Sequence, residues 1–120
     1  GRPQVTDVVP LGVEATELLA VAAAVEAGSS HPFAVAIAAR AEAEGLRPPP
    51  STGAKALVGK GVEAQVGGET AWVGSPRFAS EMGALDSEGV RRAKVLEEEG
   101  KTVVVVFRPR RALGLLALWD

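Results

Sequence analysis

Residues 26–33 read EAGSSHPF and contain His31, the only histidine of the chain. Before this stretch, apolar residues recur at the i, i+3, i+4 and i+7 spacing that places them on one face of a helix. The pattern predicts a helix over residues 14–27, and Gly28 supplies a residue that ends it. The apolar face consists of Leu18, Val21, Ala22 and Val25.

A second helix is predicted directly after the same stretch. Pro32 suits the first turn of a helix, and either Ser30 or His31 can cap that turn. The apolar positions that follow keep helical spacing until Gly45. Residues 26–33 are therefore predicted to be the turn between two paired helices, and the three prolines at 48–50 end the helical part of the sequence.

The remaining sequence alternates between strand and helix patterns. A hairpin is predicted where apolar residues recur every second position on both sides of Gly67-Gly68. The other predicted elements are an edge strand at 4–9, strands at 102–107 and 112–118, and helices from Ser75 to about Met82 and from Ser87 to Gly100. The predicted fold class is α+β, a mainly antiparallel β-sheet flanked by two helical hairpins.

Composition narrows the possible functions. The 120 residues are 47% hydrophobic, enough for one ordinary domain. With 13 basic and 15 acidic residues intermixed, the chain lacks the basic stripe of a nucleic-acid-binding protein. The absence of cysteine removes disulfides, thiolate metal sites and cysteine nucleophiles, and a single histidine cannot form a zinc site alone.

The ends of the sequence suggest a segment of a longer protein. The chain has no initiating methionine and stops at Asp120 directly after an apolar run. No apolar stretch approaches the roughly 20 residues that cross a bilayer, and the first ten residues do not resemble a signal peptide.

The turn between the helices is the first candidate site. Glu26 lies in the last turn of a helix, where the macrodipole disfavours an acid by about 0.3–1 kcal/mol. Its position therefore suggests a ligand, with His31 close by at the start of the next helix. The alternative is that His31 only caps that helix and that Glu26 is solvated.

Two glycine motifs are the other candidates. Gly59-Lys60-Gly61 precedes a strand, so it is neither a dinucleotide fingerprint nor a phosphate loop, and it could be an ordinary turn. Glycine also lets a backbone approach a ligand closely, and on that basis we expect Gly61→Asp to weaken ligand binding while preserving the fold. Gly74-Ser75 ends a strand, which by itself indicates an ordinary strand end with a structural role only.

Taken in order, these motifs resemble the nucleotide-binding domain of heavy-metal-transporting P-type ATPases. In that family an acid precedes a Ser-Glu-His-Pro motif, and a Gly-x-Gly and a Gly-Asn follow. The spacing is matched here by Glu26, residues 29–32, residues 59–61 and residues 74–75. Ser30 stands where the family usually has glutamate, and Ser75 where it usually has asparagine. The sequence therefore does not determine which contacts these two side chains make.

The resemblance implies a role for each matched residue. Glu26 would accept a hydrogen bond from the adenine amine, His31 would contact the ring, and the glycines would let the triphosphate pass close to the backbone. Lys60 could contact phosphate at the rim of the site or be solvated, and we favour the solvated state. The implied nucleotide-binding residues are Glu26, His31, Gly59, Gly61, Val62, Ala64, Gly74 and Ser75.

The resemblance also implies a setting for the domain. Residues 1–120 would form one nucleotide-binding domain, with residues 1–4 and 115–120 adjoining a phosphorylation domain. Its partners would be ATP, ADP, and the phosphorylation and actuator domains of one parent chain, a membrane pump with this domain in the cytoplasm. The fragment itself would be monomeric and non-catalytic, and Mg²⁺ would be needed by the full pump only.

Two other functions stay open on the sequence alone. Ser30 and Ser75 could mark a degenerate regulatory or scaffolding domain of the same fold that binds nucleotide weakly or not at all. An independent phosphohydrolase would need an internal nucleophile and a magnesium-binding carboxylate cluster, and neither is evident from the sequence.

Overall fold

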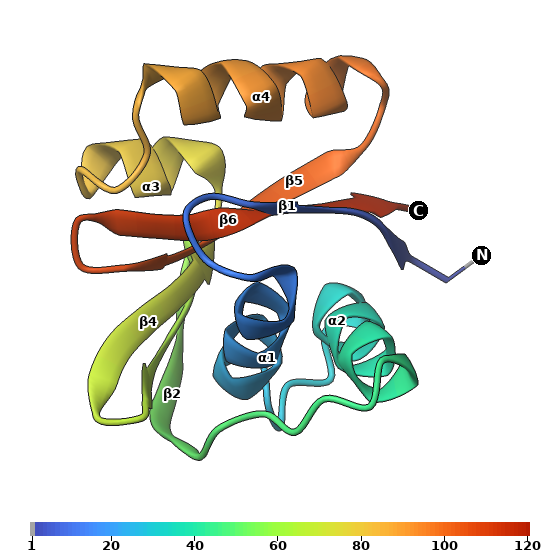
Figure 1. Cartoon of the computed structure of the whole chain (residues 1–120), viewed down its shortest axis with the longest axis vertical. Helices are drawn as coiled ribbons and strands as arrows, with labels where there is room; N and C mark the ends of the chain where they lie inside the picture. Colours follow the sequence, from blue (N-terminus) through green and yellow to red (C-terminus); the bar gives the residue numbers. More distant parts are fainter. Residues whose placement is uncertain (1) are drawn as a thin grey trace.

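A computed structural model describes residues 2–120, so Gly1, part of the expected edge at 1–4, lies outside the described residues. The centre of the fold is a six-stranded sheet with strand order β1-β6-β5-β4-β3-β2, in which every neighbouring pair is antiparallel (Figure 1). The strands are β1 (Gln4–Pro10), β2 (Ser51–Leu57), β3 (Gly61–Val66), β4 (Glu69–Gly74), β5 (Thr102–Arg108) and β6 (Arg111–Trp119).

Two pairs of helices cover the two faces of this sheet (Figure 1). The first pair packs on a core that includes Leu18, Ile37 and Leu116, and the second on a core that includes Phe78 and Phe107. This arrangement confirms the α+β fold predicted from the sequence. The helices are α1 (Ala15–Val25), α2 (Pro32–Ala43), α3 (Pro76–Glu81) and α4 (Ser87–Glu98).

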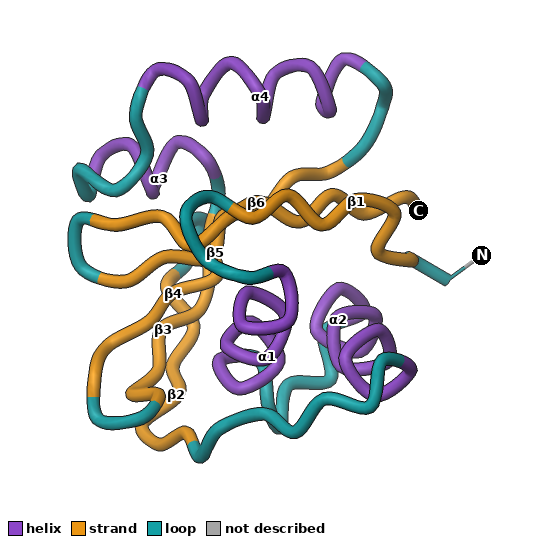
Figure 2. Tube along the Cα trace, in the orientation of Figure 1, coloured by secondary structure: helices purple, strands orange, loops and turns teal. Residues whose placement is uncertain are grey.

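The sheet opens between β4 and β5. These strands share only three register pairs, the last of which joins Gly74 to Val105. Beyond that pair the chain leaves the sheet to form α3, so residues 102–104 of β5 have no partner on that side. Figure 2 shows β1, β5 and β6 running in a different direction from β2, β3 and β4.

Strand β2 is the element that the sequence pattern did not predict. It is an edge strand in which residues 52–56 are exposed, so no apolar alternation marks it. The cap of α4 also differs from the prediction, because Asp86 rather than Ser87 accepts the hydrogen bond, from the N–H of Gly89 at 2.9 Å. Within the described residues no helix is both long and apolar enough to span a membrane.

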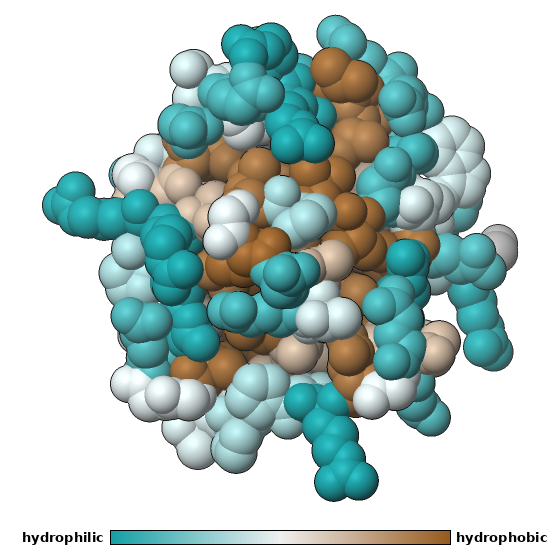
Figure 3. Space-filling view, viewed as in Figure 1, coloured by the Kyte–Doolittle hydropathy of each residue, from teal (hydrophilic) through white to brown (hydrophobic). Residues whose placement is uncertain are grey.

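The hydrophobic side chains of the face in Figure 3 gather along the middle of the view, with hydrophilic side chains around them.

Candidate functional site

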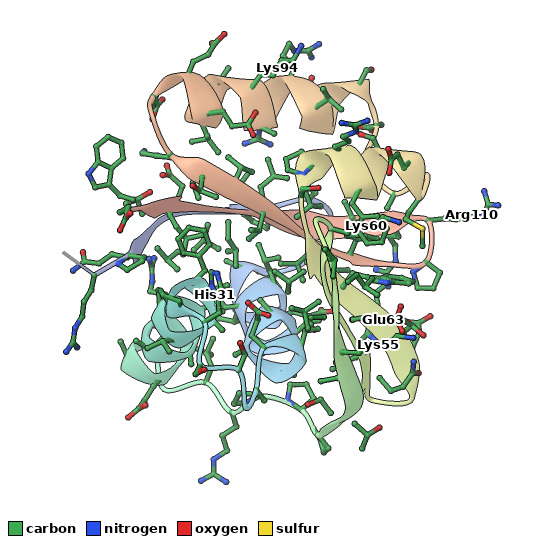
Figure 4. The ribbon with its side chains drawn as sticks, turned by 180° about the vertical axis from the view of Figure 1, so that it is seen from behind. His31, Lys55, Lys60, Glu63, Lys94 and Arg110 are labelled. Atoms are coloured by element: carbon green, nitrogen blue, oxygen red, sulfur yellow. The ribbon has the colours of Figure 1, made fainter. Side chains whose placement is uncertain are left out.

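A cleft of about 510 Å³ lies where the sheet opens. Its walls come from the α1–α2 turn, the loop between β2 and β3, the end of β4 and the start of β5. Figure 4 shows His31 and Lys60, two residues far apart in sequence that both line it. Seven of the eight residues expected in a nucleotide site line this cleft: Glu26, His31, Gly59, Gly61, Val62, Gly74 and Ser75.

Ala64 is the exception. It is 1% exposed and belongs to the core between the sheet and the first helix pair. Val62 and Ala64 share one face of β3 because side chains alternate along a strand, but only Val62 reaches the cleft. The structure therefore places Ala64 behind the site rather than in its wall.

His31 both caps α2 and lines the cleft. Its Nδ1 accepts a hydrogen bond from the backbone N–H of Phe33 at 3.1 Å. In the neutral ring the proton must then be on Nε2, because Nδ1 acts as the acceptor. The ring meets Phe33 edge-on, with centroids 5.3 Å apart and planes at 68°. Capping by His31 was the alternative left open by the sequence, and it is compatible with a ligand contact through the rest of the ring.

Glu26 is a buried acid at the C-terminal end of α1. Its side chain lines the cleft, the residue is only 8% exposed, and burial raises the pKa of its carboxyl to about 7. Oε1 has no hydrogen-bond partner. Among residues 2–120 it is the only buried side-chain nitrogen or oxygen atom without one. The alternative that Glu26 is solvated is therefore wrong.

The glycines of the cleft differ in what a side chain at each position would contact. Gly61 has φ +145°, and a Cβ there would lie 2.2 Å from the carbonyl oxygen of Val73 and 2.5 Å from Gly74 Cα. A Cβ on Gly74 would lie 2.8 Å from the carbonyl oxygen of Lys60. At Gly61 the space is occupied by the backbone of β4, and at Gly74 by the Lys60 carbonyl of the β2–β3 loop and the Phe78 ring of α3. The expectation that Gly61→Asp would preserve the fold is therefore wrong.

Gly59 differs from this pair, because a Cβ at that position would meet nothing within 4 Å. Its φ of +72° favours glycine, but the space beside it opens to the cleft and the solvent. Of these three glycines, Gly59 is the one whose missing side chain leaves room for a ligand.

The two serines that depart from the family pattern occupy different surroundings. Ser75 lines the cleft and caps α3, where its Oγ accepts the N–H of Phe78 at 3.1 Å. Its hydroxyl therefore already serves the fold. Ser30 is exposed and does not line the cleft, so the cleft walls do not depend on its side chain.

Several cleft residues were not singled out from the sequence as site residues. Phe33 and Ile37 follow the histidine at helical spacing, which marked them as core residues rather than cleft walls. Residues 102–104 sit in an apolar strand whose pattern carries no sign of a missing neighbour. Only the topology of the sheet shows that this strand segment faces the cleft.

A smaller hollow of about 240 Å³ continues from the cleft. The two share Val58, Gly59, Lys60 and Ser75, and the hollow also contacts Arg77. Lys60 is exposed, with Nζ 5.6 Å from the centre of the Phe78 ring. Lys60 and Arg77 thus lie beside the hollow together with Glu81, whose carboxylate pairs with Arg77 at 3.4 Å. Among residues 2–120 no cluster of three or more histidine, aspartate or glutamate side chains could hold a metal ion.

Comparisons with known proteins agree on one family of transporters, although no family model matches the chain. The chain is 41% identical over 123 residues to the zinc/cadmium/lead-transporting P-type ATPase of Shigella sonnei (strain Ss046), covering 100% of this chain and 16% of that protein. It is 40% identical over 125 residues to the copper-exporting P-type ATPase of Bacillus subtilis (strain 168), covering 100% of this chain and 15% of that protein. The chain thus spans only a small part of these curated relatives.

A solved structure matches over almost its whole length. The crystal structure of the N-domain of HMA8, a copper-transporting P-type ATPase, superposes with a TM-score of 0.82 at 35% identity. The match covers 95% of this chain and 98% of that one. Both the sequence motifs and the sheet topology therefore correspond to one separately folded domain of such pumps.

Proposed function

The chain belongs to the nucleotide-binding domains, or N-domains, of heavy-metal-transporting P-type ATPases of the P1B class, and from this premise we propose that its cleft binds ATP. Adenine is held by Glu26 and His31, and the γ-phosphate is presented to an aspartate outside this chain. The observation that carries the proposal is the buried acid Glu26, which lines the cleft and has one carboxyl oxygen without a hydrogen-bond partner.

Glu26 is suited to an amine donor. A buried oxygen without a partner costs about 1–3 kcal/mol, so the free domain retains this cost in its folded state. The exocyclic amine of adenine supplies the missing donor when the base enters the cleft. Guanine carries a carbonyl oxygen at that position, which sets two acceptors against each other when the carboxyl is ionised.

His31 supplies a flat partner with a defined donor. Because Nδ1 is engaged by the N–H of Phe33, the neutral ring offers Nε2–H and its face to a ligand. Phe33 and Ile37 add apolar wall on the same side of the cleft. A planar base with polar edges fits walls of this kind better than a sugar or a peptide does.

The phosphates leave the base pocket past Gly59. The missing side chain there leaves open space, and the smaller hollow continues in that direction toward Lys60 and Arg77. A cation next to a phosphate path favours the triphosphate by charge, so Lys60 assists the tail rather than the base. The exposure of Lys60 agrees with the solvated state favoured from the sequence, and its contact with phosphate is part of the proposal.

The domain works within a larger pump. Gln4 pairs with Trp119, so the first and last strands bring the two ends of the described chain to the same side of the sheet (Figure 1). We propose that the phosphorylation domain of the parent chain attaches there. We place residues 1–120 in the cytoplasm as a monomeric, non-catalytic module that meets the phosphorylation and actuator domains by hinge motion. ATP and ADP are its ligands, and Mg²⁺ acts in the full pump rather than in base recognition here.

Calorimetric titration of the isolated domain with ATP and GTP tests this function. ATP should bind about 5- to 150-fold more tightly than GTP, the ratio that 1–3 kcal/mol at one mismatched polar pair provides. Lys94→Ala is a matched control, because Figure 4 shows Lys94 on α4, across the sheet from His31. Glu26→Gln should reduce the preference for ATP, whereas the control should leave it unchanged.

The same titration addresses the alternative functions. A folded domain that binds neither nucleotide would support the degenerate regulatory or scaffolding domain instead. Equal affinity for ATP and GTP would contradict base reading by Glu26. Release of inorganic phosphate during prolonged incubation would indicate an independent phosphohydrolase and would contradict the non-catalytic module.

A further inference from the structure

The opening of the sheet leaves a stretch of backbone directed at the cleft. Val103 lines the cleft, yet its side chain packs in the core on the opposite face of the sheet, with Phe78 and Phe107. The part of Val103 that reaches the cleft is therefore its backbone.

The direction of its N–H and C=O groups follows from the pairing of the neighbouring strands. In an antiparallel ladder, successive residues direct these groups to alternate sides. The N–H of Ser75 donates to the carbonyl oxygen of Lys60 at 2.9 Å, so the backbone N–H and C=O of Ser75 are directed toward β3. Those of Gly74, one residue earlier, are therefore directed toward β5.

Gly74 is in register with Val105, so the backbone N–H and C=O of Val105 are directed toward β4. The N–H and C=O of Val103, two residues earlier on β5, are directed to the same side, but β4 has already left the sheet at that point. In the described part of the chain, no loop or turn hydrogen bond involves the backbone of Val103. The N–H and C=O of Val103 are therefore available to a ligand in the cleft.

We infer that the Val103 backbone is a second base-reading element, whose C=O accepts one hydrogen of a purine amine and whose N–H donates to the adjacent ring nitrogen. This inference rests on the proposed function. The amine has two hydrogens, and the carboxylate of Glu26, which lines the same cleft, is the acceptor for the other. The two acceptors, Glu26 and the C=O of Val103, and the one donor, the N–H of Val103, then match adenine. Guanine would instead present its carbonyl oxygen to both acceptors.

Two variants separate the backbone from the side chain. Val103→Pro removes the N–H, and the β5–β6 ladder should tolerate this change because that N–H does not point toward β6. Val103→Ala keeps the N–H and also removes part of the side chain, which makes it the matched control. Val103→Pro should bind ATP at least about fivefold more weakly than Val103→Ala.

Amide exchange in the labelled parent domain tests the inference even if the proline variant does not fold. Without nucleotide, the Val103 amide should exchange faster than that of Val104, which points toward β6. ATP should protect the Val103 amide, and either 1-deaza-ATP or 7-deaza-ATP, which lack one ring nitrogen each, should fail to do so. If ATP shifts the signals of Glu26 and His31 but leaves the Val103 amide unprotected, the inference is wrong and the proposed function stands. If ATP shifts no signal of the cleft, the proposed function itself fails.

Discussion

Gly61 and Gly74 face each other across β3 and β4, so closely that a Cβ on Gly61 would lie 2.5 Å from Gly74 Cα. This pair lets β4 stay against β3 up to the residue where the chain turns away into α3. The same departure opens the sheet beside β5 and creates the cleft. The glycines that mark the family by sequence are thus partly requirements of the fold.

Gly61→Ala should destabilise the domain by roughly 3 kcal/mol or more, because the new Cβ meets backbone atoms and φ is unfavourable. Gly59→Ala should cost only about 1 kcal/mol, since its φ is positive but the space is open. Denaturant unfolding of the two variants measures both values. Equal stability of the two would contradict the packing described for Gly61.

His31→Ala should lower stability by about 1 kcal/mol because it removes the cap of α2. His31→Asn should restore much of that stability, since asparagine is a good N-cap, without restoring the ring. Both variants should weaken ATP, ADP and AMP by similar factors, as the three share adenine. A loss confined to the triphosphate would show that His31 contacts phosphate instead.

Glu26→Gln should change how stability depends on pH. Burial raises the pKa of Glu26 from 4.5 to about 7, so between those values the folded state holds a proton that the unfolded state has lost. The stability of the parent should therefore fall as the pH rises from about 4.5 to 7, by roughly 3 kcal/mol relative to Glu26→Gln. Thermal unfolding of both proteins at pH 4.5 and pH 8 checks this. A constant difference between the two would contradict the burial of an ionisable carboxyl.

Adenosine affinity should rise with pH around the raised pKa of Glu26. The ionised carboxylate is the stronger acceptor, so ligand binding favours loss of the proton from Glu26. From pH 6 to pH 8 the affinity should increase up to roughly tenfold in the parent and much less in Glu26→Gln. Adenosine avoids the titration of phosphate, and the variant shares every other titrating group. A matching rise in both proteins would place the responsible group elsewhere.

Helix positions could be predicted from the sequence because their signals are local. The helix that begins at Pro32 and the one that begins after Ser75 have a cap and a proline in sequence, and both start where predicted. Strand β2 could not be predicted in this way. It lies exposed at the sheet edge, and its pairing with β3 is what defines it.

The candidate site was predicted in part for a similar reason. Motif order identified Glu26 and His31, but whether they were buried or solvated depended on the packing of distant elements. Ala64 was included because it follows the glycines on the strand, and only the position of the core excludes it from the wall. The contribution of Val103 depends on where β4 leaves the sheet, which no pattern in β5 records.

The location of ATP on the isolated domain is the most direct test of the account. Backbone amide shifts of the labelled parent domain should be recorded during titration with ATP. The account predicts that the affected residues cluster around Glu26, His31, Gly59 and residues 102–104, and that α4 is unaffected. Shifts centred on another surface, such as the turn that contains Arg110, would contradict the assignment of this cleft as the ATP site.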